Sequence, residues 1–280
     1  MNARTDRPGD EDVLAALQEC IALQSPTPPG DAQPVAGWVQ QWAERMGAHV
    51  SRQSVWDGAD NVLAALRFGD GPRLVFNSHM DVVDPSTQVW QTEPYRAVRR
   101  DGRMIGRGTA DAKGSLVAML AAMQRLADRP EGVAGELLLT AVVAEEAGGL
   151  GSKHLASQGL SADAAVVGEP TGLRVAHAHK GTYMRRLTFT GQAAHSASPW
   201  LGRNAVADAA AFVAATEQET GRLARHPHPT LGPGTLTVTI FHGGRLQNTV
   251  PADAEVLVDR RLVPGETHAQ CDAELAALLA

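Results

Sequence analysis

Up to about residue 180, the chain alternates short apolar runs with longer segments that carry apolar residues at helical spacing. No other feature constrains the fold as strongly, because strands alternating with helices favour an α/β sheet with substantial parallel character. The predicted strands are 62–67, 73–77, 136–143 and 164–167. The predicted helices are 11–24, 33–46 and 114–127, the first two separated by the break SPTPPG. Residues 1–180 are therefore expected to form a mixed, largely parallel sheet flanked by helices.

The pattern changes in residues 181–280. The predicted elements are, in order, strand 183–190, helix 204–224, strands 235–241 and 254–262, and helix 267–280. The order β-α-β-β-α is that of a ferredoxin-like α+β unit without its fourth strand. This segment is therefore predicted to form a second, incomplete domain, with the boundary near residue 180.

Charge and composition exclude several classes of partner. The formal net charge of −6 provides no basic surface for nucleic acid. The polar N-terminal segment lacks the apolar core of a signal peptide, and no apolar run is long enough to span a membrane. Cys20 and Cys271 lie far apart and form no disulfide framework. We expect a cytoplasmic protein that binds neither nucleic acid nor membranes.

Polar side chains gather in four short segments, three of which begin where a predicted apolar strand ends. These three are SHMD (78–81), AEEAGG (144–149) and GEPT (168–171), and the fourth, GTADAKG (108–114), precedes a predicted helix. In open α/β sheets, ligands bind beyond the carboxyl ends of the strands. The side chains expected at one edge of the sheet are His79, Glu145, Glu146 and Glu169, joined by Asp111.

One imidazole and several carboxylates that converge in this way are costly unless a cation neutralises them, because like charges at close range raise one another's pKa. A mixed set of His and carboxylate donors suits zinc, and manganese or cobalt accept a similar set. Each residue also has an ordinary interpretation. A single His after a strand is more often a structural hydrogen-bonding group, and Asp111 alone fits a helix N-cap. The two glutamates alone fit a solvated loop, and GEPT alone fits a turn.

The four segments together resemble the M20 family of metallopeptidases and deacylases, which includes acetylornithine deacetylase and succinyl-diaminopimelate desuccinylase. The motifs SHMDVV, GRGTADAKG, EEAGG and GEPT have the order and spacing of that family. The resemblance implies two zinc ions per subunit in the complete enzyme, with cobalt or manganese as alternatives. It implies that His79 and Glu169 bind one ion, that Glu146 binds the other, and that Asp111 bridges both.

The resemblance also assigns the remaining roles in the first domain. Asp81 would orient the imidazole of His79, a role that carboxylates beside metal ligands often have. Glu145 would be the general base, taking a proton from the attacking water and passing it to the leaving amine. A cis peptide between Asp111 and Ala112 is implied as well.

In residues 181–280 the segments GQAAHSASP and GRNA resemble the family's lid and dimerisation domain. The resemblance implies a homodimer in which His195 reaches the partner's site and helps to hold an oxyanion. Asn248 and Arg261 match positions that contact the substrate and its carboxylate. The alternatives are a strand-end cap for His195 and a surface salt bridge for Arg261. The neighbouring Arg260 is expected to face the other way, because side chains alternate along a strand.

In the family, the chain returns from the lid and supplies a late His to the second zinc, whereas residue 280 falls inside the lid's second helix. The resemblance therefore leads us to expect a fragment that alone binds the second metal poorly or is inactive. The expected reaction is hydrolysis of the amide of an N-acylated amino acid or small peptide-like substrate, on the acetylornithine deacetylase pattern. The alternatives are a dipeptidase or carboxypeptidase of the same family, and a non-catalytic homologue that acts as a binding protein.

Overall fold

The computed structural model describes residues 9–27 and 31–279. The polar N-terminal residues 1–8, the end of the predicted break (28–30) and Ala280 lie outside the described residues. The chain divides between Leu173 and Arg174 into two compact units, each with its own hydrophobic core. Each unit is therefore considered by itself.

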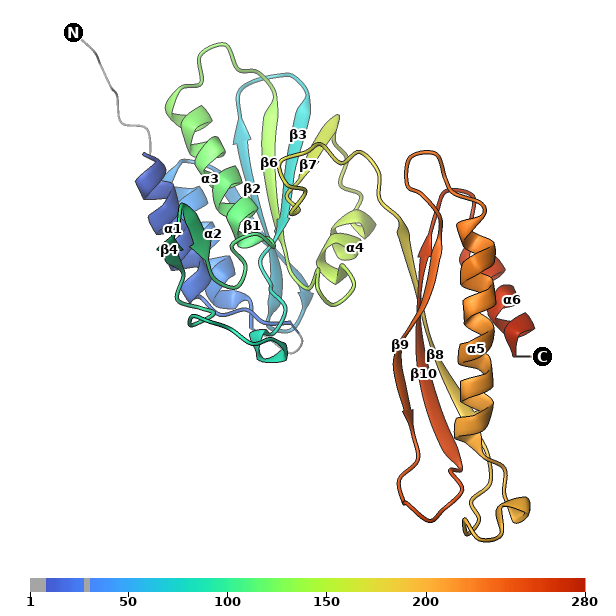
Figure 1. Cartoon of the computed structure of the whole chain (residues 1–280). Helices are drawn as coiled ribbons and strands as arrows, with labels where there is room; N and C mark the ends of the chain where they lie inside the picture. Colours follow the sequence, from blue (N-terminus) through green and yellow to red (C-terminus); the bar gives the residue numbers. More distant parts are fainter. Residues whose placement is uncertain (1–8, 28–30, 280) are drawn as a thin grey trace. The chain divides into compact units, whose positions relative to one another are not determined.

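The first unit contains a mixed five-stranded sheet with the strand order β1-β2-β6-β3-β7 (Figure 1). The strands are β1 (His49–Trp56), β2 (Ala59–Arg67), β3 (Arg73–His79), β6 (Glu136–Val142) and β7 (Ala164–Val167). β3 pairs in parallel with both β6 and β7, whereas β2 is antiparallel to β1 and to β6. The predicted α/β class with a mixed sheet is confirmed, and its parallel part is the β6-β3-β7 half.

Helices flank this sheet. They are α1 (Asp10–Ala22), α2 (Gln33–Arg45), α3 (Lys113–Asp128) and α4 (Leu150–Ser157). Figure 1 shows α1, α2 and α3 grouped together beside the sheet, and α1 packs on α3. Leu116, Leu120 and Met123 recur at helical spacing on α3 and are fully buried in the common core. Burial of each such side chain contributes about 1.5–3 kcal/mol to folding, so this face fixes α3 against the sheet.

Strand β1, helix α4 and a short hairpin were not predicted from the sequence. Strand β1 reads HVSRQSVW, with few apolar residues, because it lies at the edge of the sheet and is only partly buried. Helix α4 spans eight residues, too few for a clear helical period. A short hairpin, β4 (Val98–Arg100) with β5 (Arg103–Ile105), was also missed. The three parallel strands still end within two residues of the predicted positions.

The second unit has the element order β8 (Gly181–Thr190), α5 (Ala205–Ala224), β9 (Thr235–Gly243), β10 (Asp253–Leu262) and α6 (His268–Leu278). Its antiparallel sheet has the order β8-β10-β9. Alternate residues of β10 are buried in a core shared with α5, so the strand turns one face to the helix. Asn204 caps α5, its side chain accepting from the backbone N–H groups of Val206 and Ala207.

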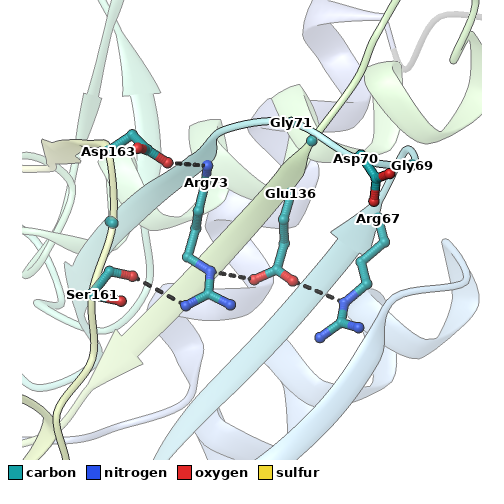
Figure 2. A pocket seen from close by; sticks show the side chains of 10 residues that line it. Arg67, Gly69, Asp70, Gly71, Arg73, Glu136, Ser161 and Asp163 are labelled. Carbon is teal, nitrogen blue, oxygen red and sulfur yellow. Dashed lines mark hydrogen bonds and ion pairs between the residues drawn. The ribbon is translucent and has the colours of Figure 1, made fainter.

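The edge of the first sheet at which β3 and β6 begin is closed by ion pairs (Figure 2). The Glu136 carboxylate lies between two guanidinium groups, with Arg73 Nε at 2.7 Å and Arg67 Nε at 2.8 Å. Asp163 accepts from the backbone N–H of Arg73 at 2.7 Å, and Ser161 accepts from its guanidinium through the backbone carbonyl at 3.1 Å. Three neighbouring strands and the segment before β7 are thereby joined at this edge.

Across the described parts of the chain, none of the helices combines the length and the apolar character that crossing a bilayer requires.

Candidate metal centre

The predicted polar segments come together at the other end of the strands, where β3, β6 and β7 finish. His79 is the last residue of β3, and Glu145 and Glu146 follow β6. Glu169 follows β7, and Asp111 precedes α3. Potential ligand atoms of His79, Asp111 and Glu169 all lie within 4.8 Å of one another, and the same holds for His79, Glu145 and Glu146. Because the three strands are parallel, their carboxyl ends meet here, and the five side chains form one cluster around His79.

The His79 imidazole forms the floor of this cluster, with 1% of its surface exposed. Its Nδ1 lies 2.9 Å from the backbone oxygen of Asp81, and its Nε2 lies 3.0 Å from Asp111 Oδ1. A carbonyl oxygen can only accept, so Nδ1 carries a proton and a neutral imidazole presents the lone pair of Nε2 to the cluster. Burial lowers the pKa of His79, but hydrogen bonds and negative charge from Asp111 and Asp81 outweigh it and raise the pKa to about 10.

The fully buried Asp81 fixes the turn that carries the two glutamates. Its Oδ1 accepts from the backbone N–H of Glu145, and its Oδ2 accepts from that of Glu146, both at 3.1 Å. The turn starts at Ala144, whose φ of 53° lies in the left-handed region that alanine rarely adopts. Such a conformation costs about 1–2 kcal/mol, and the two hydrogen bonds to Asp81 hold it in place. Asp81 therefore contacts both the imidazole and the backbone of the glutamate segment.

Asn61, a fully buried residue of β2, holds the two ends of the same segment. Its Oδ1 accepts from the backbone N–H of Val143 at 3.1 Å, and its Nδ2 donates to the backbone oxygen of Gly151 at 3.0 Å. A side chain at Gly151 would collide with both groups, since a Cβ there would lie 2.4 Å from the Val143 oxygen and 2.6 Å from Asn61 Oδ1. The glutamate segment is therefore held at both ends by Asn61.

A buried lysine, Lys113, anchors the Asp111 segment to the end of α1. Helix α3 begins at Lys113 and its N-cap position is Ala112, so the interpretation of Asp111 as an N-cap is wrong. The peptide between Asp111 and Ala112 is cis, as the resemblance implied. Lys113 Nζ donates to the backbone oxygens of Cys20 at 3.1 Å and Leu23 at 2.6 Å, at the end of α1. Burial lowers the pKa of Lys113 to about 8.

Negative charge accumulates in the cluster without a matching cation. Burial raises the pKa of Glu146 and of Glu169, and the neighbouring Asp111 carboxylate raises both further. The hydrogen bond from His79 lowers the pKa of Asp111. Among residues 9–27 and 31–279, no Lys or Arg forms an ion pair within 4.0 Å of these carboxylates. His79 pairs with Asp111 at 3.0 Å, and Arg107 lowers the pKa of Asp111 only through its charge at longer range. A buried imidazole with an oriented Nε2 and several uncompensated carboxylates fits a divalent cation of the zinc, manganese or cobalt type.

Two of the predicted residues of the second unit lie close together. His195 and Asn248 are both exposed, on neighbouring segments joined by a bridge between His195 and Thr249. The Ser196 N–H donates to the Asn248 backbone oxygen at 2.9 Å. The Ala197 N–H donates to His195 Nδ1 at 3.1 Å, so a neutral His195 carries its proton on the exposed Nε2.

Arg261 lies elsewhere in the second unit. It pairs with Thr182 near the opposite end of β10 from Asp253, roughly 27 Å along the strand at the usual rise per residue. Arg260 is 2% exposed and binds Glu266 at 2.5 Å, whereas Arg261 is on the other face and binds Asp259 at 2.9 Å. The two arginines therefore face opposite ways, and the Arg261 side chain forms a salt bridge with Asp259.

Sequence inspection missed Asn61 and Lys113 as supports of the site. Lys113 offered a signal, because it is a charged residue at the start of an apolar helix and within the GTADAKG motif. Asn61 offered none, since a polar residue at the start of a strand is common and its partners lie 82 and 90 residues away.

Comparison with known proteins identifies the family. The sequence model of "Peptidase family M20/M25/M40" matches residues 75–270. The chain is 32% identical over 234 residues to a probable succinyl-diaminopimelate desuccinylase of Staphylococcus epidermidis, covering 74% of this chain and 58% of that protein. It is 32% identical over 277 residues to a probable carboxypeptidase of Aspergillus oryzae, covering 91% of this chain and 65% of that protein. The chain thus spans about three fifths of the length of these curated relatives.

The fold is also that of a solved family member. An M20 family metallo-carboxypeptidase from Sulfolobus solfataricus superposes with a TM-score of 0.80 at 21% identity, covering 96% of this chain and 75% of that chain. At this level of identity the likeness concerns the fold alone. The family match, in contrast, extends over more than half of the sequence and includes every residue of the cluster. The chain therefore belongs to peptidase family M20/M25/M40.

Proposed function

We propose that this protein is a metal-dependent hydrolase that cleaves the amide bond of a small N-acylated amino acid, on the pattern of acetylornithine deacetylase. The observation that carries the proposal is the cluster around His79, in which carboxylates converge on an oriented imidazole and form no ion pair with a Lys or Arg of the described residues. The family match and the name desuccinylase of a relative support hydrolysis of an acyl amide.

In this proposal His79, Asp111 and Glu169 hold one divalent ion, which agrees with the mutual distances of their ligand atoms. Glu146 contributes to a second ion, shared with Asp111, and zinc is the preferred metal with cobalt or manganese as alternatives. Bound divalent ions would polarise the amide carbonyl and acidify water. Asp81 keeps the Nδ1 side of the imidazole occupied, so that Nε2 remains directed at the ligands.

Glu145 is the proposed general base. Its backbone N–H is fixed by Asp81, and its carboxylate lies in the cluster beside Glu146. A carboxylate that is within reach of water but is not needed as a ligand can take the water's proton and return it to the leaving amine. A protein that only binds ligands has no need for this second glutamate.

The second unit supplies the proposed lid, so that residues 1–180 form the catalytic domain and 181–280 the lid and dimerisation domain. His195 presents an exposed Nε2–H that suits a developing oxyanion, and the Asn248 amide lies on the adjoining segment. Arg261 would bind a substrate carboxylate after exchanging its Asp259 partner. A homodimer through this unit, with His195 serving the partner's site, is part of the proposal.

A dipeptidase or carboxypeptidase activity is the second candidate, favoured by the relative named a probable carboxypeptidase, whose match covers 91% of this chain. The test is a panel of N-acetyl and N-succinyl amino acids and dipeptides, offered to the complete gene product with zinc or cobalt and with a chelator. We expect metal-dependent hydrolysis of one class, and loss of at least ~100-fold in rate for Glu145→Gln with metal content retained. Metal-independent hydrolysis, or none across the panel, would contradict the proposal.

A further inference from the structure

Two serine hydroxyl groups lie beneath the cluster and have no role in the proposed reaction. Ser78 precedes His79 on β3, and Ser115 lies in the first turn of α3. Their Oγ atoms are 3.1 Å apart. Ser115 Oγ is 2.7 Å from the backbone oxygen of Ala112 and 2.9 Å from that of Gly168. Ser78 Oγ is 3.2 Å from the same Ala112 oxygen. One small network thus joins three segments that are distant in sequence.

The positions of these partners follow a pattern. Ser78, Ala112 and Gly168 are each the immediate sequence neighbour of a residue in the first ligand triad, His79, Asp111 and Glu169 respectively. Any displacement of one segment relative to the others would change a ligand spacing and stretch one of these hydrogen bonds. The hydrogen bonds therefore fix the distances between the backbone segments that carry His79, Asp111 and Glu169.

The hydrogen bonds of the two serines depend on one another, because there are fewer donors than acceptors. Each hydroxyl has one proton to donate, and a carbonyl oxygen can only accept. Two protons cannot fill all four contacts at once. When Ser78 donates to Ser115, the Ser115 proton goes to the carbonyl oxygen of Ala112 or of Gly168, so a hydroxyl that accepts also donates. Ser78 and Ala112 are at most 1% exposed and Ser115 is half-buried, so water is kept from the Ser78 side of the network, where the bonds strengthen one another.

A close backbone contact supports the same view independently. Gly168 approaches Ser115 so closely that a Cβ at this glycine would lie 2.7 Å from both the Cβ and the Oγ of Ser115. A side chain there would push the Glu169 segment away from α3. The glycine of GEPT is therefore required for the contact with this serine, in addition to any role in the turn.

We propose that Ser78 and Ser115 are positioning residues that set the spacing of His79, Asp111 and Glu169 and thereby determine the affinity for the divalent ion. This inference rests on the metal centre of the proposed function. Neither serine belongs to the groups of potential ligands. A merely structural role would stabilise the fold without changing how tightly the ligands hold a cation, so metal affinity and folding stability separate the two possibilities.

The test is titration of the metal-free chain with cobalt(II), followed by visible absorption, for the parent and for Ser115→Ala, Ser78→Ala and the double variant. Thermal unfolding of each metal-free protein by circular dichroism gives the stability alone. We expect Ser115→Ala to weaken cobalt binding about 10- to 100-fold, as for other groups that support metal ligands, with an altered visible spectrum. Ser78→Ala should weaken it less, and the double variant less than the product of the two single effects.

Ser157→Ala is the matched control. Its hydroxyl also donates to the carbonyl three residues earlier in a helix, at 2.7 Å, but at the exposed end of α4. We expect parental cobalt affinity and spectrum for this variant. Unchanged affinity and spectrum in both Ser115→Ala and Ser78→Ala, whatever their thermal stability, would overturn the inference and leave the proposed function standing. Absence of cobalt binding by the parent chain would overturn both.

Discussion

Acidic side chains lie at both ends of the strands in the first unit's sheet, but their charge is balanced at one end and not at the other. Where β3 and β6 begin, the Glu136 carboxylate has a guanidinium on either side, from Arg73 and Arg67 (Figure 2). Asp163 at this edge accepts a backbone N–H. Each of these acidic groups is satisfied by the protein itself, which is the usual arrangement for a structural ion-pair network.

Where β3, β6 and β7 end, the acidic groups are not balanced in this way. Glu146 and Glu169 have raised pKa values because burial and the Asp111 charge both disfavour their ionised forms. His79 is the nearby cation, and it also forms the floor of the ligand cluster. β3 carries an arginine at its other end, Arg73, but a histidine here. The contrast indicates that one edge contributes to folding and that the other is kept for an external cation at some cost in stability.

The strongest test of this contrast is His79→Ala. Removal of the imidazole leaves the carboxylates without their nitrogen ligand, and we expect cobalt or zinc affinity to fall by more than ~100-fold. The measurement is metal titration followed by absorption or calorimetry. His49→Ala, at an exposed site on β1, is the control and should bind as the parent does. If His79→Ala bound metal as tightly as the parent, the unbalanced carboxylates around His79 would not be a metal site.

Asp81→Asn tests the support of the ligands with nearly unchanged volume. The amide retains one acceptor oxygen for the two N–H groups of Glu145 and Glu146, and its NH₂ group faces a donor. We expect metal affinity to fall about 10- to 100-fold and the metal-free protein to lose about 1–3 kcal/mol of stability. Asp163→Asn at the other edge should reduce stability alone. An equal loss of metal affinity in both variants would contradict the contrast.

The pH dependence of metal binding should show which proton the ion displaces. The metal-free protein holds His79 protonated below its raised pKa of about 10, and a metal ligand must be neutral. Affinity should therefore rise about tenfold per pH unit from about pH 6 to about pH 8, with one proton released per ion. The stability that the charged His79 gives the metal-free protein is lost as pH rises through 10. Calorimetry in buffers of different ionisation enthalpy measures the number of protons released per ion. Metal affinity that does not change with pH would contradict displacement of the His79 proton.

The gathering of the polar segments at one end of the parallel strands could be predicted, because it follows from local sequence information. Each proposed ligand lies at or after the end of a strand or precedes a helix, and the parallel order of β3, β6 and β7 then brings the segments together. Strand β1 escaped prediction because it is polar and lies at an edge, where the apolar alternation is weak. The antiparallel placement of β2 next to β6 is likewise a property of the assembled sheet.

The supports of the site could not be predicted, because their partners are chosen by the tertiary structure. Ser115 bonds to a carbonyl 53 residues away, and Lys113 bonds to carbonyls 93 and 90 residues away. Nothing in a local pattern distinguishes these residues from an ordinary helix start. Arg261 shows the opposite case, since strand alternation correctly separated its face from that of Arg260 but gave no indication of its distance from His195.

The smallest expected effect concerns the balanced edge. Glu136→Gln removes the charge between Arg73 and Arg67, whose side chains are 36% and 75% exposed. Pairs of this exposure are each worth about 0.2–1 kcal/mol, so we expect a loss of about 1 kcal/mol in the free energy of unfolding, measured with urea at low salt. Added salt should reduce the difference between variant and parent. Cobalt affinity should remain parental, because no ligand or support is touched. A tenfold loss of affinity would show that the two edges are coupled through the strands, and charge balance at one edge would then contribute to the metal centre at the other.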